Sequence, residues 1–232
     1  MDFLETSAIR KKFIPALSAT RQIICIDLPG HGKSEGFSEV HSMKEMAICV
    51  KAVIDELEIK QVSLAGHSMG GYVGLELLKN FPMLLKSIVL INSTPLVDSV
   101  ERLQVRDRGI ELVAKNKNAF VSMAITNLFD SESRAKFQSE IKELKQNALK
   151  MSVKTIQASI KGMKIRTNLF SDLKNSTSSK LIIAGTNDKL IETSELERIS
   201  RESNSTFISL DGGHMLPVEN EVGIQNQLHL ID

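Results

Sequence analysis

A serine between two glycines, in the pattern Gly66-x-Ser68-x-Gly70, is the residue of this chain best suited to nucleophilic chemistry. The apolar run before it predicts a short strand, Gln61–Ala65, and the amphipathic pattern after it predicts a helix to about Asn80. The chain must turn sharply between the two, and a side chain at either glycine would collide with the neighbouring strand or helix. The spacing therefore predicts a serine on a strained turn, with its hydroxyl clear of the sheet and the helix N-terminus favouring an anion beside it.

A serine hydroxyl needs a base to accept its proton, and His214 is the best candidate among the five histidines. It follows a predicted strand in a Gly-Gly-His loop, and parallel sheets bind ligands at the carboxyl ends of their strands. His67 directly precedes the serine, so its side chain should point away and pack. His31 lies in a Gly-His-Gly turn, and we expect its side chain to stabilise that loop rather than to take part in catalysis. We predict that His41, before a helix cap, and His229, near the C-terminus, lie on the surface.

The acid that orients the histidine should also follow a strand. Asp188 fits, because it closes a four-residue turn that begins at Gly185, after the apolar run LIIAG. Asp98, which follows an earlier predicted strand, is the second candidate. Asp211 is close to His214 along the chain, but capping of the local turn is favoured for it.

The elements that position these residues alternate between strand and helix, which predicts an α/β fold with a mostly parallel, doubly wound sheet. One helix should begin at Ser42, where Ser42-x-x-Glu45 forms a capping box. Besides Gln61–Ala65, the predicted strands are Gln22–Asp27, Ser87–Asn92, Lys180–Ala184 and Thr206–Leu210, and the other predicted core helices are Thr6–Leu17, Thr193–Arg201 and one from about Pro217.

The pattern changes between Thr94 and Ser179, where helical periodicity continues without a convincing strand. The helical segments lie near 98–115, 118–129, 132–150 and 152–163. These helices could simply cover one side of the core. However, they interrupt a regular alternation of strands and helices, which favours a lid. We therefore predict a helical lid over 95–178 and a core made of 1–94 and 179–232.

Composition and net charge restrict the classes of partner and the cellular compartment that we expect. A formal net charge of +1 with 25% charged residues does not suggest a nucleic-acid or anionic-membrane partner, which leaves a small-molecule substrate. Cys25, in a predicted buried strand, and Cys49, in a predicted helix, have no motif spacing, which favours two thiols in a reducing compartment over a disulfide. No signal peptide and no membrane span is recognisable, so a cytoplasmic protein is expected.

Four segments together resemble the α/β-hydrolase superfamily, specifically its lidded branch of carboxylesterases, enol-lactonases and lyases. They are IDLPGHGKS (26–34), GHSMGG (66–71), GTNDKLI (185–191) and GGHMLPVENE (212–221). The resemblance implies that Ser68 is the nucleophile, Asp188 the acid and His214 the base, in the chain order of that fold. It also implies that the Met69 backbone N–H donates to the oxyanion. No metal or organic cofactor is required.

The chain departs from this family at its N-terminus. Members normally begin with a hairpin and a strand ending in His-Gly, whose next residue gives the second oxyanion N–H. Here FLETSAIRKKFIPALS (3–18) resembles the family's segment directly after that His-Gly, so Phe3 is the nearest match to the second donor. The strand without a counterpart would lie between Gln22–Asp27 and Gln61–Ala65. Either the chain is part of a longer protein or the sheet has closed around the gap.

The residues and the resemblance together predict a serine hydrolase that cleaves a small ester, thioester or lactone through an acyl-enzyme. Two alternatives stay open. A lyase could use the same three residues as a base without an acyl-enzyme, and a non-catalytic remnant or ligand-binding protein would fit the gap at the N-terminus.

Overall fold

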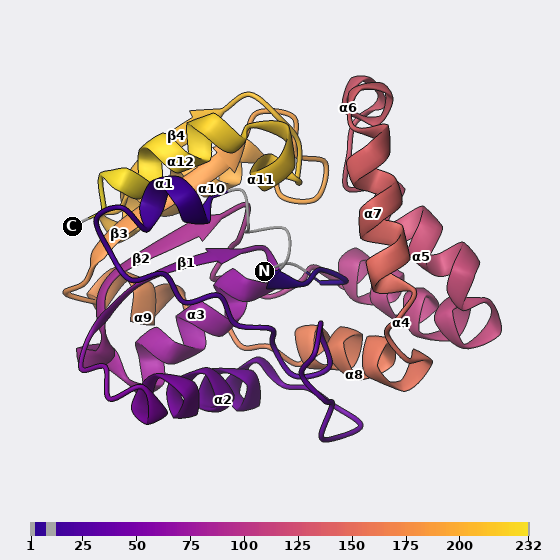
Figure 1. The fold of residues 1–232 in the computed structure, drawn as a ribbon, viewed down its shortest axis with the longest axis horizontal. Helices are drawn as coiled ribbons and strands as arrows, with labels where there is room; N and C mark the ends of the chain where they lie inside the picture. The colour runs from indigo at the N-terminus through magenta and orange to yellow at the C-terminus, as the bar shows by residue number, and fades with distance from the viewer. Residues whose placement is uncertain (1–2, 8–12, 232) are drawn as a thin grey trace.

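A four-stranded parallel sheet forms the centre of the molecule (Figure 1). The computed structural model describes residues 3–7 and 13–231. The strands β1 (Val62–His67), β2 (Leu85–Ile91), β3 (Ser179–Gly185) and β4 (Thr206–Leu210) lie in that order, and each neighbouring pair is parallel. All four carboxyl ends therefore meet at one edge of the sheet, where sheets of this kind bind ligands.

Helices cover both faces of the sheet, as the apolar runs in β2 and β3 require. Alternate residues of β2 pack on opposite faces: Leu90 joins the larger apolar cluster, and Val89 joins the smaller one. The helices of the larger cluster are α2 (Met43–Glu56), α3 (Met69–Asn80), α9 (Phe170–Asn175) and α10 (Thr193–Ser203), and those of the smaller one are α1 (Ile14–Leu17), α11 (Leu216–Glu219) and α12 (Glu221–His229). This arrangement confirms the predicted fold class.

The capping box predicted at the start of α2 is present. The Ser42 hydroxyl oxygen accepts a hydrogen bond from the Glu45 N–H at 3.2 Å, and a Glu45 carboxylate oxygen accepts one from the Ser42 N–H at 3.2 Å. Between α3 and β2 the chain forms one short 3₁₀ helix, η2 (Pro82–Leu84).

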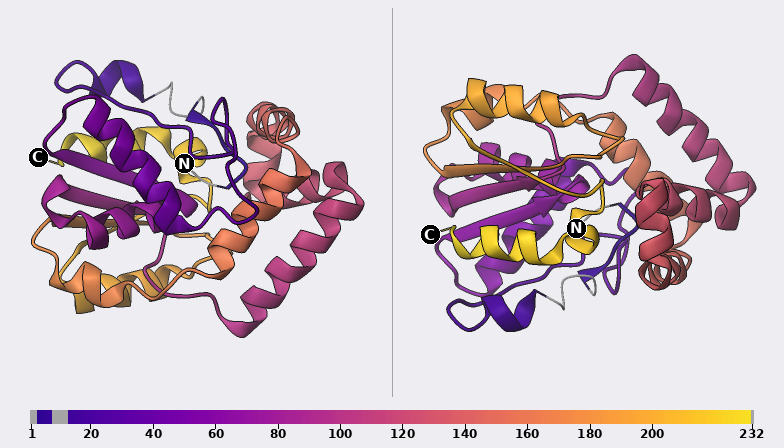
Figure 2. Two further views of the ribbon diagram at one scale, coloured as in Figure 1. Left: turned by 90° about the horizontal axis from the view of Figure 1, so that it is seen from below. Right: turned by 90° about the horizontal axis from the view of Figure 1, so that it is seen from above.

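The segment predicted as a lid is helical and lies beyond the carboxyl ends of the strands (Figures 1 and 2). Its helices are α4 (Val100–Lys115), α5 (Lys117–Thr126), α6 (Ser131–Lys136), α7 (Gln138–Ala148) and α8 (Val153–Lys164). α8 packs directly against the loop before α2. The approach is so close that a Cβ on Gly162 would lie 1.7 Å from the His41 carbonyl oxygen. The helices agree with the predicted segments, except that 132–150 divides at Phe137 into α6 and α7.

The predicted strand Gln22–Asp27 is wrong. No residue of this segment belongs to a strand, and β1 has only β2 as a neighbour in the part of the chain that the structure describes. A largely apolar cavity of about 460 Å³ is lined by residues of this segment and of β1. The sheet has therefore not closed around the gap, and the segment has no adjacent edge with which to pair.

Three other local predictions need correction. The helix predicted over Thr6–Leu17 is confirmed only for Ile14–Leu17, since residues 8–12 lie outside the described part. Cys25 is exposed, because no strand covers the segment that holds it; neither cysteine is in a disulfide. His41 is buried rather than on the surface: its ring lies 5.1 Å from that of Phe37, and burial lowers its pKa.

Among the described residues, no helix is long and apolar enough to cross a membrane.

We expect the open edge of β1 to promote aggregation, because unpaired strand edges are templates for intermolecular pairing. Ser63 is exposed on β1, so Ser63→Lys should slow aggregation several-fold, measured as light scattering against protein concentration. The unfolding free energy should change by no more than about 0.5 kcal/mol. The control is Met83→Lys, which adds the same charge at an exposed apolar residue of η2, away from this edge. Equal protection by both variants would contradict an edge-specific route.

Candidate active site

The turn that carries Ser68 has the strained geometry predicted for it. Ser68 lies between β1 and α3 with φ 49° and ψ −117°, a left-handed region that side chains rarely adopt. Glycine is required at position 66: a Cβ on Gly66 would lie 2.5 Å from the Gly70 carbonyl oxygen and 2.7 Å from the Gly71 Cα. The strand and the helix therefore meet too closely for any side chain at Gly66.

The structure brings Ser68, His214 and Asp188 together in one hydrogen-bonded chain. The His214 Nε2 lies 2.9 Å from the Ser68 Oγ, and the His214 Nδ1 lies 2.8 Å from the Asp188 Oδ2. The two side chains of the histidine–aspartate pair are 2% and 1% exposed, so the pair is shielded from water. Ser68 follows β1, Asp188 follows β3 and His214 follows β4, so each residue comes from the carboxyl end of a different strand.

Asp188 is held as a carboxylate. Its Oδ1 accepts hydrogen bonds from the backbone N–H groups of Leu190 at 2.7 Å and Ile191 at 3.2 Å, while Oδ2 faces the histidine. Burial alone would raise the pKa of Asp188, but His214 and these two amides hold it below its usual range. An ionised acceptor at this position fixes the His214 Nδ1 as a donor, which leaves Nε2 as the unprotonated nitrogen that faces the Ser68 hydroxyl.

The two predicted oxyanion donors occupy different surroundings. Met69 is the first residue of α3, so its N–H has no acceptor within its own helix and lies next to Ser68. Phe3 lies in a turn, and its ring packs against that of Phe120 in α5, with 6.5 Å between the centroids. Glu5, two residues later, has a carboxylate oxygen 3.7 Å from the His67 Nδ1, which places this N-terminal segment at the carboxyl end of β1.

Asp98, the second candidate acid, belongs to a separate ion cluster. Its two carboxylate oxygens contact the Arg106 Nε at 2.5 Å and an Arg166 terminal nitrogen at 2.8 Å. Burial alone would raise the pKa of Asp98, but Arg166 and Arg106 hold it below its usual range. The Arg166 guanidinium also lies 4.3 Å from the ring centroid of Tyr72 on α3. This cluster ties the inserted helices to the core.

Three residues beside Ser68, His214 and Asp188 make contacts that the sequence alone does not predict. His67 is buried, as a packing role requires, and its Nε2 donates to the His214 carbonyl oxygen at 2.7 Å. Asn92 and Ser93, directly after β2, also bond to the loops of the site. Their only sequence signal is a polar pair at the end of an apolar strand, which does not reveal partners in distant segments. His31, by contrast, braces its own turn as predicted, with Nδ1 3.1 Å from the Pro29 carbonyl oxygen.

Glu219 lies between the loop that carries His214 and the helix α6. Its Oε2 accepts from the Gly213 N–H at 2.9 Å, and the Ser133 side chain of α6 acts on the same carboxyl and lowers its pKa. Burial is the largest cause and raises the pKa of the Glu219 carboxyl, and the nearby Asp130 adds to that effect. Ser133 and the backbone of Gly213 and Met215 act against it without cancelling it. A carboxyl whose pKa is raised by folding stabilises the fold most below its unfolded pKa, and that contribution is lost as pH rises through the folded value.

We therefore expect Glu219→Gln to raise the melting temperature at pH 8 and to have little effect near pH 4, because glutamine keeps the acceptor for Gly213 and removes the buried charge. The measurement is thermal unfolding of both proteins across this pH range. Glu39→Gln, at an exposed position, is the control and should give a difference that does not grow with pH. A constant or falling difference for Glu219→Gln would contradict the buried-carboxylate account.

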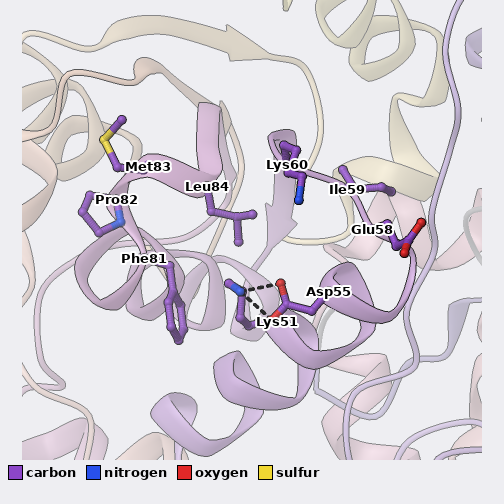
Figure 3. A pocket seen from close by; sticks show the side chains of 9 residues that line it. All are labelled: Lys51, Asp55, Glu58, Ile59, Lys60, Phe81, Pro82, Met83 and Leu84. Atoms are coloured by element: carbon purple, nitrogen blue, oxygen red, sulfur yellow. Dashed lines mark hydrogen bonds and ion pairs between the residues drawn. The ribbon is translucent and has the colours of Figure 1, made fainter.

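A second hollow, of about 410 Å³, lies at the opposite end of the strands (Figure 3). It is lined by residues that precede β1 and β2, such as Lys60 and Leu84, and it includes an ion pair between Lys51 and Asp55 at 2.5 Å. Because parallel sheets place their chemistry at the carboxyl ends, this hollow is not the active-site candidate. No group of three His, Cys, Asp or Glu side chains that could hold a metal occurs among residues 3–7 and 13–231.

Comparison with known proteins agrees with this architecture. A sequence model described as alpha/beta hydrolase fold matches residues 3–221. The chain belongs to this family. An esterase from Thermogutta terrifontis superposes with a TM-score of 0.91 at 23% identity, over 97% of this chain and 85% of its own. The enol-lactonase from Burkholderia xenovorans gives 0.91 at 16% identity, over 99% of this chain and 88% of its own. At these identities the two structures support the fold alone.

Two relatives in sequence match most of this chain. It is 27% identical over 217 residues to the dihydrolipoyllysine-residue acetyltransferase component of the acetoin cleaving system of Pseudomonas putida, matching 92% of this chain and 57% of that protein. It is 25% identical over 214 residues to the putative carbamate hydrolase RutD of Pantoea ananatis, matching 87% of this chain and 75% of that protein. The chain thus spans just over half the length of the first relative.

Proposed function

We propose that this protein is a serine hydrolase that cleaves a small carboxylic ester, thioester or lactone through an acyl-enzyme. The observation that carries the proposal is the hydrogen-bonded chain from Ser68 through His214 to Asp188, with the serine on a strained turn at the carboxyl end of β1. A hydroxyl, an imidazole and a carboxylate in this geometry form the arrangement that activates a serine for attack on a carbonyl.

In the first half-reaction the Ser68 Oγ bonds to the substrate carbonyl carbon while His214 Nε2 accepts the hydroxyl proton. The tetrahedral intermediate then expels the alcohol, thiol or ring oxygen, which takes that proton from His214, and an acyl-serine remains. In the second half-reaction water attacks the acyl carbonyl, and His214 again transfers the proton, now from water to the leaving Ser68. Asp188 keeps the imidazole in the required tautomer and stabilises its charged form.

The developing oxyanion requires backbone donors. The Met69 N–H, at the start of α3, is the first donor, and the Phe3 N–H is the proposed second one. Each such donor typically stabilises the transition state by about 3–4 kcal/mol. The helices of 95–178, beyond the strand ends, are the proposed lid that shapes substrate selectivity.

A non-catalytic protein is the second candidate, and the cavity beside β1 favours it, since that gap adjoins the strand that carries Ser68. The test is labelling with a fluorophosphonate probe, followed by peptide mapping. Covalent labelling at Ser68 requires an activated hydroxyl and supports the hydrolase. Absence of labelling on protein that melts cooperatively would support the non-catalytic candidate. The turnover of p-nitrophenyl acetate and butyrate then establishes the reaction.

A further inference from the structure

The end of β2 contains a buried asparagine in an unusual backbone conformation. Asn92 follows the last residue of β2, is fully buried, and has φ 43°. Asparagine is one of the few residues besides glycine that adopt this left-handed region readily. β2 lies between β1 and β3, so Asn92 is placed between the strand that leads to Ser68 and the strand that leads to Asp188.

The Asn92 side chain bonds to both of the loops that carry the acid and the base. Its Nδ2 donates to the carbonyl oxygens of Gly213 and His214, each at 2.9 Å, which uses both hydrogens of the amide. Its Oδ1 accepts from the Gly185 N–H at 2.7 Å, at the start of the turn that leads to Asp188. The backbone N–H of Asn92 itself donates to Ile183 of β3 at 2.9 Å.

The next residue makes the corresponding contact to the serine. The Ser93 Oγ donates to the Ser68 carbonyl oxygen at 2.9 Å, and Ser93 is fully buried. The fit is close, because a Cβ on Gly71 would lie 2.2 Å from the Ser93 Oγ. The two consecutive residues after β2 therefore contact the three segments that carry Ser68, Asp188 and His214.

We propose that Asn92 is a positioning residue that holds the His214 loop at hydrogen-bonding distance from Ser68 and Asp188. This proposal rests on the proposed hydrolase function and names a residue that acts through His214. The His214 carbonyl has a second donor in the His67 Nε2 at 2.7 Å, but Asn92 also holds the Gly185 turn. Loss of the amide thus loosens the base loop and the acid turn together.

Two substitutions separate the amide from the backbone conformation. Asn92→Gly keeps the left-handed backbone and removes all three side-chain hydrogen bonds. Asn92→Asp keeps the shape and the acceptor for Gly185, but it replaces the two donated bonds with an oxygen facing two carbonyl oxygens. If Asn92 served only in packing or in forming the turn, Asn92→Asp would keep the wild-type kcat. The control is Asn204→Gly, which removes an exposed left-handed asparagine (φ 54°) at the end of α10.

We expect both Asn92 variants to lower kcat for p-nitrophenyl acetate by roughly 100-fold, the loss that a misplacement of about 1 Å can cause, with KM within about twofold. Asn204→Gly should match the wild type. The second measurement is the low-field proton resonance of the His214 Nδ1–H, which needs no substrate. We expect it to be shifted or lost in both Asn92 variants and unchanged in the control.

Wild-type kcat and an unchanged His214 resonance in Asn92→Asp would overturn the proposal, and this variant decides the matter if Asn92→Gly does not fold. A fall in melting temperature with both readouts unchanged would overturn it equally, because it would leave only a structural role. Failure of the proposed hydrolase function is recognised separately: the wild type would not be labelled by fluorophosphonate, whereas the resonance would still report the position of His214.

Discussion

Ser68→Ala should lower the rate of short p-nitrophenyl ester hydrolysis by about 10⁶-fold, to the level left by substrate binding and the oxyanion donors. The physical reason is that the Ser68 Oγ lies 2.9 Å from the His214 Nε2, and the turn of β1 into α3 that places this hydroxyl offers no substitute for it. His214→Ala should lose nearly as much, and the double variant little more, because the members of such a triad act as a unit.

The matched control is Ser63→Ala, which removes the hydroxyl of an exposed serine on the same strand. It should retain the wild-type rate. The comparison uses initial rates together with melting curves, since loss of one small hydroxyl should leave the fold intact. Wild-type esterase activity in Ser68→Ala would show that the assignment of the nucleophile is wrong.

Local pattern and chain order determine the features that the sequence predicts correctly. The apolar run Thr206–Leu210 predicts a strand with the same bounds as β4, and Gly66-x-Ser68-x-Gly70 predicts the sharp turn that the structure contains. The three residues chosen for the site meet because each follows a strand, and parallel strands bring their carboxyl ends to one edge. Their catalytic roles stay predictions.

Features that depend on neighbours distant along the chain are predicted wrongly or not at all. Gln22–Asp27 has the composition of a strand, but a strand exists only if an edge lies beside it, and a cavity lies there instead. His41 follows a polar loop and has the pattern of a surface residue, yet α8 covers it. Asn92 is the clearest case, because its three side-chain partners lie more than ninety positions later along the chain.

The two candidate acids should give opposite phenotypes. Asp188→Asn should lower kcat by about 10⁴-fold, because an amide in place of the carboxylate favours the wrong imidazole tautomer. Its effect on the fold should be small, since the side chain keeps its shape and can still accept from Leu190. Asp98→Asn should leave the rate per folded molecule nearly unchanged, because Asp98 pairs with Arg106 and Arg166 and not with His214.

The cost of Asp98→Asn should instead appear in stability. It leaves two largely buried guanidinium groups without their shared anion, and breaking a buried ion pair in this way typically costs about 3–5 kcal/mol. Native domains are stable by only about 5–15 kcal/mol, so the melting temperature should fall clearly. The measurement pairs kcat, normalised to active sites labelled by fluorophosphonate, with denaturant unfolding of each variant. A large loss of kcat in Asp98→Asn with normal activity in Asp188→Asn would move the acid to the segment after β2, and the 2.8 Å contact between His214 and Asp188 would then have only a structural role.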